Sequence, residues 1–271
     1  MDCQDAWDRS TSRLDDVALV LCGVSPHVLN PQQINAMWVI SHPERVSMRE
    51  AVGYDAVFAA SDKVAQRFAG VLGRPVEPLL QCTDQHRFRS VAPDLTRRHE
   101  VLFVGNARGV RHSVATALEV GIVPTVYGLR WDGLLPDGAW AGKYVPNEDL
   151  PATYRAAGVV LNDHWDEMRR EGLLSNRLFD LAACGARVVS DDVPGLRDVF
   201  GDAFLTFRTP AELGAAVATH LSESPERREL REALSDRVRR DHSFDARAQR
   251  LVEVIRRLQA RGLNERVKYE A

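Results

Sequence analysis

Short apolar runs alternate with amphipathic segments along most of the 271-residue chain. The runs in the first third are almost continuously hydrophobic, which is typical of parallel strands covered on both faces. We predict strands at 17–22, 36–41, 56–60 and 76–80. Helical spacing lies between them at 47–52 and 61–72, and the second of these helices has Ser61 and Gly73 as suitable cap residues. The alternation predicts βαβ units and a parallel sheet.

The same alternation begins again after a polar segment, 84–98, which contains Pro93 and reads as a linker between domains. Beyond it we predict strands at 100–104, 124–127, 158–162, 187–190 and 203–207. Predicted helices lie at 110–120, 147–157, 175–184 and 210–221, followed by two amphipathic helices at 225–240 and 245–261. The chain is therefore expected to be an α/β protein with two Rossmann-like, doubly wound parallel-sheet domains.

Composition narrows the function classes. The chain is 45% hydrophobic and 27% charged, with a formal net charge of -3, which provides no general attraction to nucleic acid or to an anionic membrane. No apolar run approaches the roughly 20 residues of a membrane span, and the polar N-terminus is unlike a signal peptide. Scattered cysteines are expected to be reduced thiols of a cytoplasmic protein: Cys3, Cys22, Cys82 and Cys184.

The segment 172–198 combines a polar turn, a short helix, a glycine stop and a buried strand. Ser175 is a suitable N-cap, and Gly185 can end the helix in a left-handed conformation. Asp180 lies about one turn into this helix, where its carboxylate can accept two hydrogen bonds from a diol while the helix start attracts an anion. A ribose next to a diphosphate offers both groups.

Two motifs resemble a known family. The pattern R-x-F-D-x-x-A-C-G-A-x-V-V-S-D-D at 177–192 and the pattern W-x-I-S-H-P at 38–43 resemble the CgeB-like (spore maturation protein-like) branch of the GT-B glycosyltransferases. The resemblance implies an acceptor domain at 1–90, trimmed at its beginning, and a donor domain at 91–244. It also implies that the helix in 245–271 crosses back to the first domain, and that residue 180 holds the ribose of a nucleotide sugar, here with Asp where the branch usually has Glu.

The sequence F-V-G-N-A-R-G-V-R-H at 103–112 joins a predicted strand to a predicted helix. Its glycine permits close backbone approach and its arginines can contact a diphosphate, although a simple turn with surface arginines fits the spacing as well. Tyr127 ends the next predicted strand and is either a pocket residue or part of the core. The segment 161–172 either faces the donor or is a solvated loop. The donor site is expected to contain Gly105, Asn106, Arg108, Arg111, Tyr127, Asn162, Asn176, Arg177 and Asp180.

His42 ends a predicted strand of the first domain, where an imidazole can act as a base or orient an acceptor hydroxyl. We expect it to be catalytic, and a hydrogen-bonded histidine at a turn is the alternative. No metal-ligand spacing repeats in the sequence, and the resemblance also implies no bound metal or cofactor.

We therefore expect a glycosyltransferase that moves a sugar from a nucleoside diphosphate sugar to an unidentified acceptor without a metal ion. The donor segment favours retention of the anomeric configuration, and inversion stays open. Homodimerisation would be one way to complete a trimmed first domain. A nucleotide-sugar epimerase of the same fold is one alternative, and a non-catalytic nucleotide-binding or partner module is another.

Overall fold

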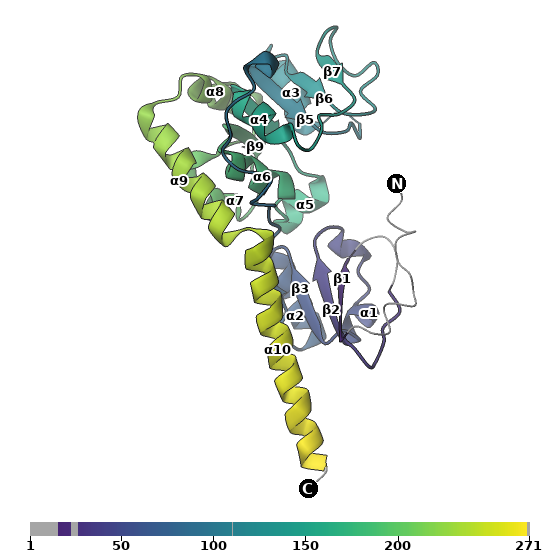
Figure 1. Cartoon of the computed structure of the whole chain (residues 1–271). Helices are drawn as coiled ribbons and strands as arrows, with labels where there is room; N and C mark the ends of the chain where they lie inside the picture. The colour runs from purple at the N-terminus through teal and green to yellow at the C-terminus, as the bar shows by residue number, and fades with distance from the viewer. Residues whose placement is uncertain (1–15, 23–26, 110, 270–271) are drawn as a thin grey trace. The chain divides into compact units, whose positions relative to one another are not determined.

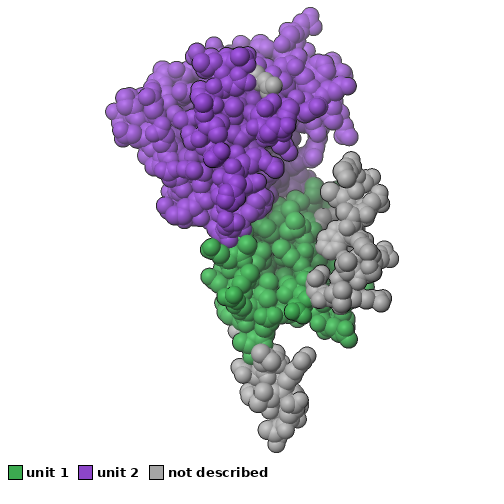
Figure 2. All heavy atoms as spheres, viewed as in Figure 1, with its two compact units in different colours: residues 1–80, 247–271 green, residues 81–246 purple. Residues whose placement is uncertain are grey.

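The computed structural model describes residues 16–22, 27–109 and 111–269, so Cys3 lies outside the described residues. The chain divides into two compact units (Figures 1 and 2). Unit 1 comprises residues 1–80 together with 247–271, and unit 2 comprises residues 81–246.

Unit 1 contains a parallel four-stranded sheet whose strands follow one another in chain order. Its strands are β1 (Val17–Leu21), β2 (Ile34–Val39), β3 (Ala56–Ala59) and β4 (Glu77–Pro78), and its helices include α1 (Met48–Val52) and α2 (Asp62–Leu72). The Ser61 hydroxyl accepts the first-turn amide of α2, and Gly73 ends that helix at φ 62°. The predicted strands and caps are thus confirmed, and β4 is shorter than expected, although the Leu79 amide just beyond it still donates to the Ala59 carbonyl at 2.8 Å.

The last helix, α10 (Phe244–Tyr269), contributes its residues from Arg247 onwards to unit 1. The Arg247 side chain donates to the carbonyl oxygen of Leu80 at 2.6 Å. Arg250 forms an ion pair with Glu77, and Arg257 lies 3.7 Å from the same carboxylate. Polar contacts therefore tie this helix to the end of the unit 1 sheet.

Unit 2 contains a parallel six-stranded sheet with the order β10-β9-β8-β5-β6-β7. Its strands are β5 (Val101–Val104), β6 (Thr125–Tyr127), β7 (Trp140–Gly142), β8 (Val159–Asn162), β9 (Val188–Asp191) and β10 (Leu205–Phe207). This is the strand order of the Rossmann fold, which reverses between its first and fourth strands. Ligands of open α/β sheets bind at the carboxyl ends of the strands at such a reversal, here between β5 and β8.

Helices cover both faces of this sheet: α3 (His112–Glu119), α4 (Leu150–Ala156), α5 (Asp166–Glu171), α6 (Asn176–Cys184), α7 (Leu196–Phe200), α8 (Pro210–Leu221) and α9 (Pro225–Asp241). Five strands contribute buried side chains to a single apolar cluster: Val101, Phe103, Val126, Val159, Leu161, Val189 and Phe207. In the described part of the chain, no helix is both long and apolar enough to cross a membrane.

Three elements were not predicted from the sequence, namely β7, α5 and α7. β7 and α5 contain no buried residue, so no hydrophobic pattern marks them in the sequence, and α7 has only five residues. No helix was predicted within 161–172, but α5 occupies Asp166–Glu171 and ends at Gly172 with φ 66°. The expected linker at 84–98 lies within unit 2 and contains a 3-10 turn, η4 (Leu95–Arg97).

Gly158 immediately precedes the central strand β8, at a position where no side chain fits. A Cβ there would lie 2.5 Å from the Glu100 carbonyl oxygen and 2.8 Å from the Leu221 side chain. We expect Gly158→Ala to lower the free energy of unfolding by about 2 kcal/mol, because backbone has to move. Gly214→Ala in helix α8 is the matched control, since its Cβ would meet only Val120 at 3.9 Å, and it should raise stability by about 0.5 to 1 kcal/mol. Equal urea midpoints for the two variants would contradict this packing.

Candidate functional site

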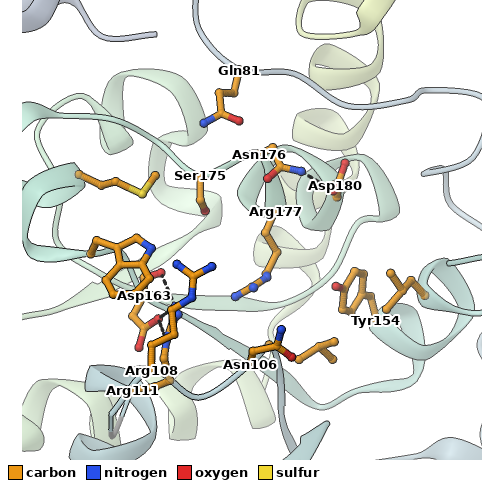
Figure 3. Close-up of a pocket in the computed structure, with 15 residues that line it drawn as sticks. Gln81, Asn106, Arg108, Arg111, Tyr154, Asp163, Ser175, Asn176, Arg177 and Asp180 are labelled. Atoms are coloured by element: carbon orange, nitrogen blue, oxygen red, sulfur yellow. Dashed lines mark hydrogen bonds and ion pairs between the residues drawn. The ribbon is translucent and has the colours of Figure 1, made fainter. Parts of the chain in front are cut away.

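A polar pocket of about 460 Å3 lies in unit 2, at the strand-order reversal between β5 and β8 (Figure 3). Three segments supply most of its wall, namely the loop after β5, the loop after β8 and the start of α6. Its lining residues are Gln81, Val104, Gly105, Asn106, Arg108, Arg111, Leu150, Tyr154, Asp163, Trp165, Met168, Ser175, Asn176, Arg177 and Asp180.

The pocket brings together most of the donor-site residues expected from the sequence. Those that line it are Gly105, Asn106, Arg108, Arg111, Asn176, Arg177 and Asp180. Tyr127 and Asn162 are absent from its lining. The Tyr127 hydroxyl lies 3.4 Å from a ring nitrogen of His99, and the fully buried Asn162 donates to Ser190 at 3.0 Å. Both side chains therefore make contacts within the protein, as expected of a buried polar group such as Asn162.

The loop after β5 is held by β6 and by the segment that follows it. The Gly105 amide donates to the Tyr127 carbonyl at 2.8 Å, and the Trp131 indole donates to the Gly105 carbonyl at 2.8 Å. The Asn106 side-chain oxygen accepts the Leu129 amide at 2.9 Å. A Cβ on Gly105 would lie 2.9 Å from the Arg177 guanidinium. Gly105 thus permits the Arg177 side chain to approach the backbone closely.

Asp163 follows β8 and joins it to the start of α3. One carboxylate oxygen accepts from Arg111 Nε at 2.8 Å, and the other accepts the Ser113 amide at 3.0 Å and the Ser113 hydroxyl at 3.1 Å. The Asp163 side chain is only 1% exposed. A helix start attracts negative charge, and in α3 this protein carboxylate provides it. Arg111 therefore lines the pocket with its charge balanced.

Arg108 and Arg177 have no such balance. The Arg108 guanidinium lies 4.3 Å from the ring centre of Trp165, and that of Arg177 lies 5.6 Å from the ring centre of Phe103. Neither forms a hydrogen bond or ion pair with any residue that the structure describes. Both point into the same space as Arg111 (Figure 3), and burial lowers the pKa of Arg177. The three lining arginines outnumber the two lining aspartates, so the pocket favours anions.

The start of α6 also faces this space. Ser175 is the N-cap as predicted, but its side chain makes no cap hydrogen bond, and its hydroxyl instead contacts the Asn162 oxygen at 3.4 Å. The first amide of the turn with a partner in the described chain is that of Leu178, which donates to the Ser175 carbonyl. The amides of Asn176 and Arg177 remain as donors for an anion.

Asp180 lies behind this turn. Its Oδ1 accepts the Thr83 hydroxyl at 2.6 Å, whereas Oδ2 has only a long contact, at 3.4 Å, with the Asn176 amide group. Burial raises the pKa of Asp180 to about 7, although the Thr83 hydrogen bond and Arg177 lower it in part. The carboxyl group is thus close to its midpoint at neutral pH.

His42 belongs to unit 1 and caps the 3-10 turn η3 (Pro43–Arg45) in a left-handed conformation with φ 48°. Its Nδ1 lies 3.1 Å from a carboxylate oxygen of Glu44, and its side chain is 40% exposed. Its expected catalytic role stays a prediction. Among the described residues, no group of three or more His, Cys, Asp or Glu side chains is arranged to hold a metal ion.

Four lining residues were not named individually from the sequence: Gln81, Tyr154, Asp163 and Trp165. The last two lie in the segment 161–172, for which the sequence left open a donor-facing segment or a solvated loop. Asp163 and Trp165 had a usable signal, because they follow directly on a predicted strand of a parallel sheet, whose carboxyl ends form the binding edge. Tyr154 lies far from the motif segments in sequence, and only the tertiary fold brings it to the pocket.

A family model described as glycosyl transferase-like matches residues 108–253 of this chain. The matched region is more than half of the sequence and contains every strand of the unit 2 sheet except β5, together with α6 and most of the pocket. No curated protein sequence matches the chain.

Solved structures with the same architecture have low sequence identity. Sucrose-phosphate synthase from Thermosynechococcus elongatus has a TM-score of 0.58 at 16% identity, with 84% of this chain and 68% of that chain covered. Trehalose 6-phosphate synthase from Burkholderia multivorans has a TM-score of 0.61 at 12% identity, with 85% and 68% covered. Anabaena HepE in complex with UDP-glucose has a TM-score of 0.62 at 14% identity, with 83% and 72% covered.

These likenesses confirm the expected GT-B fold with two parallel-sheet α/β domains. The chain is shorter than its neighbours, and it spans only 54% of the matching chain in the GtfA/B complex.

Asp180 makes stability depend on pH. Its pKa rises from 3.8 to about 7 on folding, so between these values the folded protein keeps a proton that the unfolded chain has lost. The stabilisation that this protonated carboxyl group gives the folded state is complete below pH 3.8 and disappears as the pH rises through 7. Relative to Asp180→Asn, the wild type should lose about 2 to 4 kcal/mol of unfolding free energy over this range. Urea titrations of both proteins at several pH values measure this difference, and a difference independent of pH would contradict the burial of this carboxyl group.

Proposed function

The chain belongs to the glycosyl transferase-like family, and on this premise we propose that it transfers a sugar from a nucleoside diphosphate sugar, bound in the pocket of unit 2, to an acceptor. The observation that carries the proposal is the pair of unpartnered guanidinium groups, on Arg108 and Arg177, beside the open start of α6. Two cations and free backbone amides around one space suit a diphosphate.

Each end of the donor has a candidate contact. The diphosphate accepts from Arg108, Arg177 and the first amides of α6, while Asp180 Oδ2, with its long contact to Asn176, accepts a ribose hydroxyl. Thr83 holds the other oxygen of this carboxylate and so fixes its direction. In this arrangement Arg111 orders the wall through Asp163 and is not the principal phosphate ligand.

The charge that develops on the leaving group during sugar transfer explains why such a site would favour the reaction. When the bond from the sugar to the diphosphate breaks, negative charge accumulates on the leaving phosphate oxygens. Donors that are already in place stabilise this charge without reorganisation, which is a major source of catalysis in group transfer. Arg108, Arg177 and α6 would thus bind the donor and also stabilise its departure.

The finer expectations are part of the same proposal. Resemblance of 38–43 and 177–192 supports the CgeB-like branch and a retaining reaction, which the anomeric configuration of the product would test. The UDP-glucose bound to the structural neighbour from Anabaena makes UDP the first donor nucleotide to try. The acceptor, a cytoplasmic location and a homodimer stay predictions.

Substitution of Arg108 or Arg177 should weaken the binding of UDP, whereas substitution of an arginine outside the pocket should not. Arg108→Ala and Arg177→Ala should each weaken binding of UDP about 10- to 100-fold while changing uridine affinity much less, because only the diphosphate carries the charge they contact. Arg197→Ala is the matched control, since its side chain is 80% exposed, pairs with Asp202 and lies outside the pocket. Calorimetric titration with both ligands measures the difference. If UDP bound to all three variants as it binds to the wild type, the diphosphate site would lie elsewhere.

Turnover should not require a metal ion. Because guanidinium groups and backbone amides neutralise the leaving diphosphate in the proposed site, release of free UDP from UDP-glucose should continue in excess chelator. Chromatography of the reaction mixture measures this release, which an epimerase would not produce. Loss of turnover in chelator, with recovery on addition of Mg2+ or Mn2+, would overturn the metal-independent assignment and leave the family assignment intact.

A further inference from the structure

A buried histidine and aspartate pair lies next to the pocket but does not line it. His164 stands between β8 and α5, and Asp191 ends the neighbouring strand β9. His164 Nδ1 lies 2.7 Å from Asp191 Oδ1, and the His164 backbone amide donates to Asp191 Oδ2 at 3.0 Å. Their side chains are 0% and 1% exposed. The pair is therefore held rigidly at the carboxyl edge of the sheet.

The other ring nitrogen of His164 accepts a hydrogen bond from the backbone amide of Ser175, at 3.1 Å. A backbone amide can only donate, so Nε2 has to carry the lone pair, and the ring proton has to be on Nδ1, facing Asp191. Asp191 thus selects one tautomer of His164, and only that tautomer can hold Ser175. Burial alone would raise the pKa of Asp191, but its contacts with His164 outweigh burial and lower it.

Ser175 is the N-cap of α6, whose next two residues line the pocket. A second series of hydrogen bonds also connects Ser175 to Asp191. The Ser175 hydroxyl contacts Asn162, and Asn162 donates to Ser190. Ser190 in turn donates to Asp191 at 3.1 Å. Both series of hydrogen bonds end on the Asp191 carboxylate, which also lies 3.7 Å from Arg169. Asp191, at the end of β9, therefore holds the backbone in place where it enters α6.

We infer that His164, oriented by Asp191, is a positioning residue that sets the start of α6 for the diphosphate of the donor. The inference rests on the proposed function. His164 touches no substrate in this arrangement. It acts through the Ser175 amide, so that the amides of Asn176 and Arg177 and the Arg177 side chain share one space with Arg108.

Two substitutions separate the two ends of the imidazole. His164→Gln can place its carbonyl oxygen near the position of Nε2 and keep an acceptor for Ser175. His164→Asn can place its amide group near the position of Nδ1 and keep a donor for Asp191, but it offers no acceptor for Ser175. We expect His164→Asn to weaken both UDP and inorganic pyrophosphate about tenfold, with uridine changed less than threefold, and His164→Gln to bind all three within about twofold of wild type. A purely structural role would instead affect uridine and the phosphate ligands alike.

The tautomer is measured independently of any ligand. The nitrogen-15 spectrum of the His164 ring in the full-length protein should show Nδ1 protonated and Nε2 unprotonated. In Asp191→Asn, the new amide can donate to Nδ1 and move the ring proton to Nε2, and pyrophosphate affinity should fall about tenfold with it. Thermal unfolding of each variant shows that it is folded at the titration temperature.

The outcomes distinguish the two proposals. If the wild type bound neither UDP nor pyrophosphate, the proposed function and the inference would both fall. If the wild type bound them and His164→Asn bound them equally well, only the positioning role would be wrong. A spectrum with Nε2 protonated in the wild type would also overturn that role, whatever the affinities.

Discussion

The binding edge of unit 2 depends on the buried carboxylate of Asp163. It accepts hydrogen bonds from Arg111 and from the backbone and hydroxyl of Ser113, and so ties the end of β8 to the loop and helix that follow β5. These two strands flank the point where the strand order reverses. Without this link, two neighbouring loops would be free to separate just where the pocket needs a continuous wall. A buried carboxylate that lost its partners would also be costly, so the link is strongly determined.

That link divides the arginines of the pocket into two kinds. Arg111 binds a protein carboxylate, whereas the guanidinium groups of Arg108 and Arg177 lie over aromatic rings and keep their N–H donors available for a ligand. Stacking on an aromatic ring orients a guanidinium group without consuming its hydrogen bonds. His164 and Asp191 orient backbone donors in a similar way. They hold the amide of Ser175, the residue just before the free amides of α6. Preorganised donors of this kind are what a developing phosphate charge requires.

The sequence predicts the strands, the longer helices and most of the binding edge, because buried parallel strands and glycine-ended helices leave visible patterns. Asp180, Arg177 and Gly105 could be found this way, since each lies just beyond a predicted strand or in the first turns of a predicted helix. The commitment of Arg111 to Asp163 joins residues 52 positions apart, and nothing in either segment reveals it. The hydrogen bond from Thr83 to Asp180 is equally invisible in the sequence. Tyr127 and Asn162 were expected in the pocket because each ends a strand. They do not line it, because the position of a residue at a strand end does not determine which way its side chain points.

A structure of the protein with UDP-glucose bound would test the central claim most directly. The account predicts density for the diphosphate between Arg108, Arg177 and the first amides of α6, with a ribose hydroxyl at Asp180 Oδ2 and the Arg111 to Asp163 link unchanged. A diphosphate bound away from the start of α6, or an Arg111 that left Asp163 to become the main phosphate ligand, would contradict it.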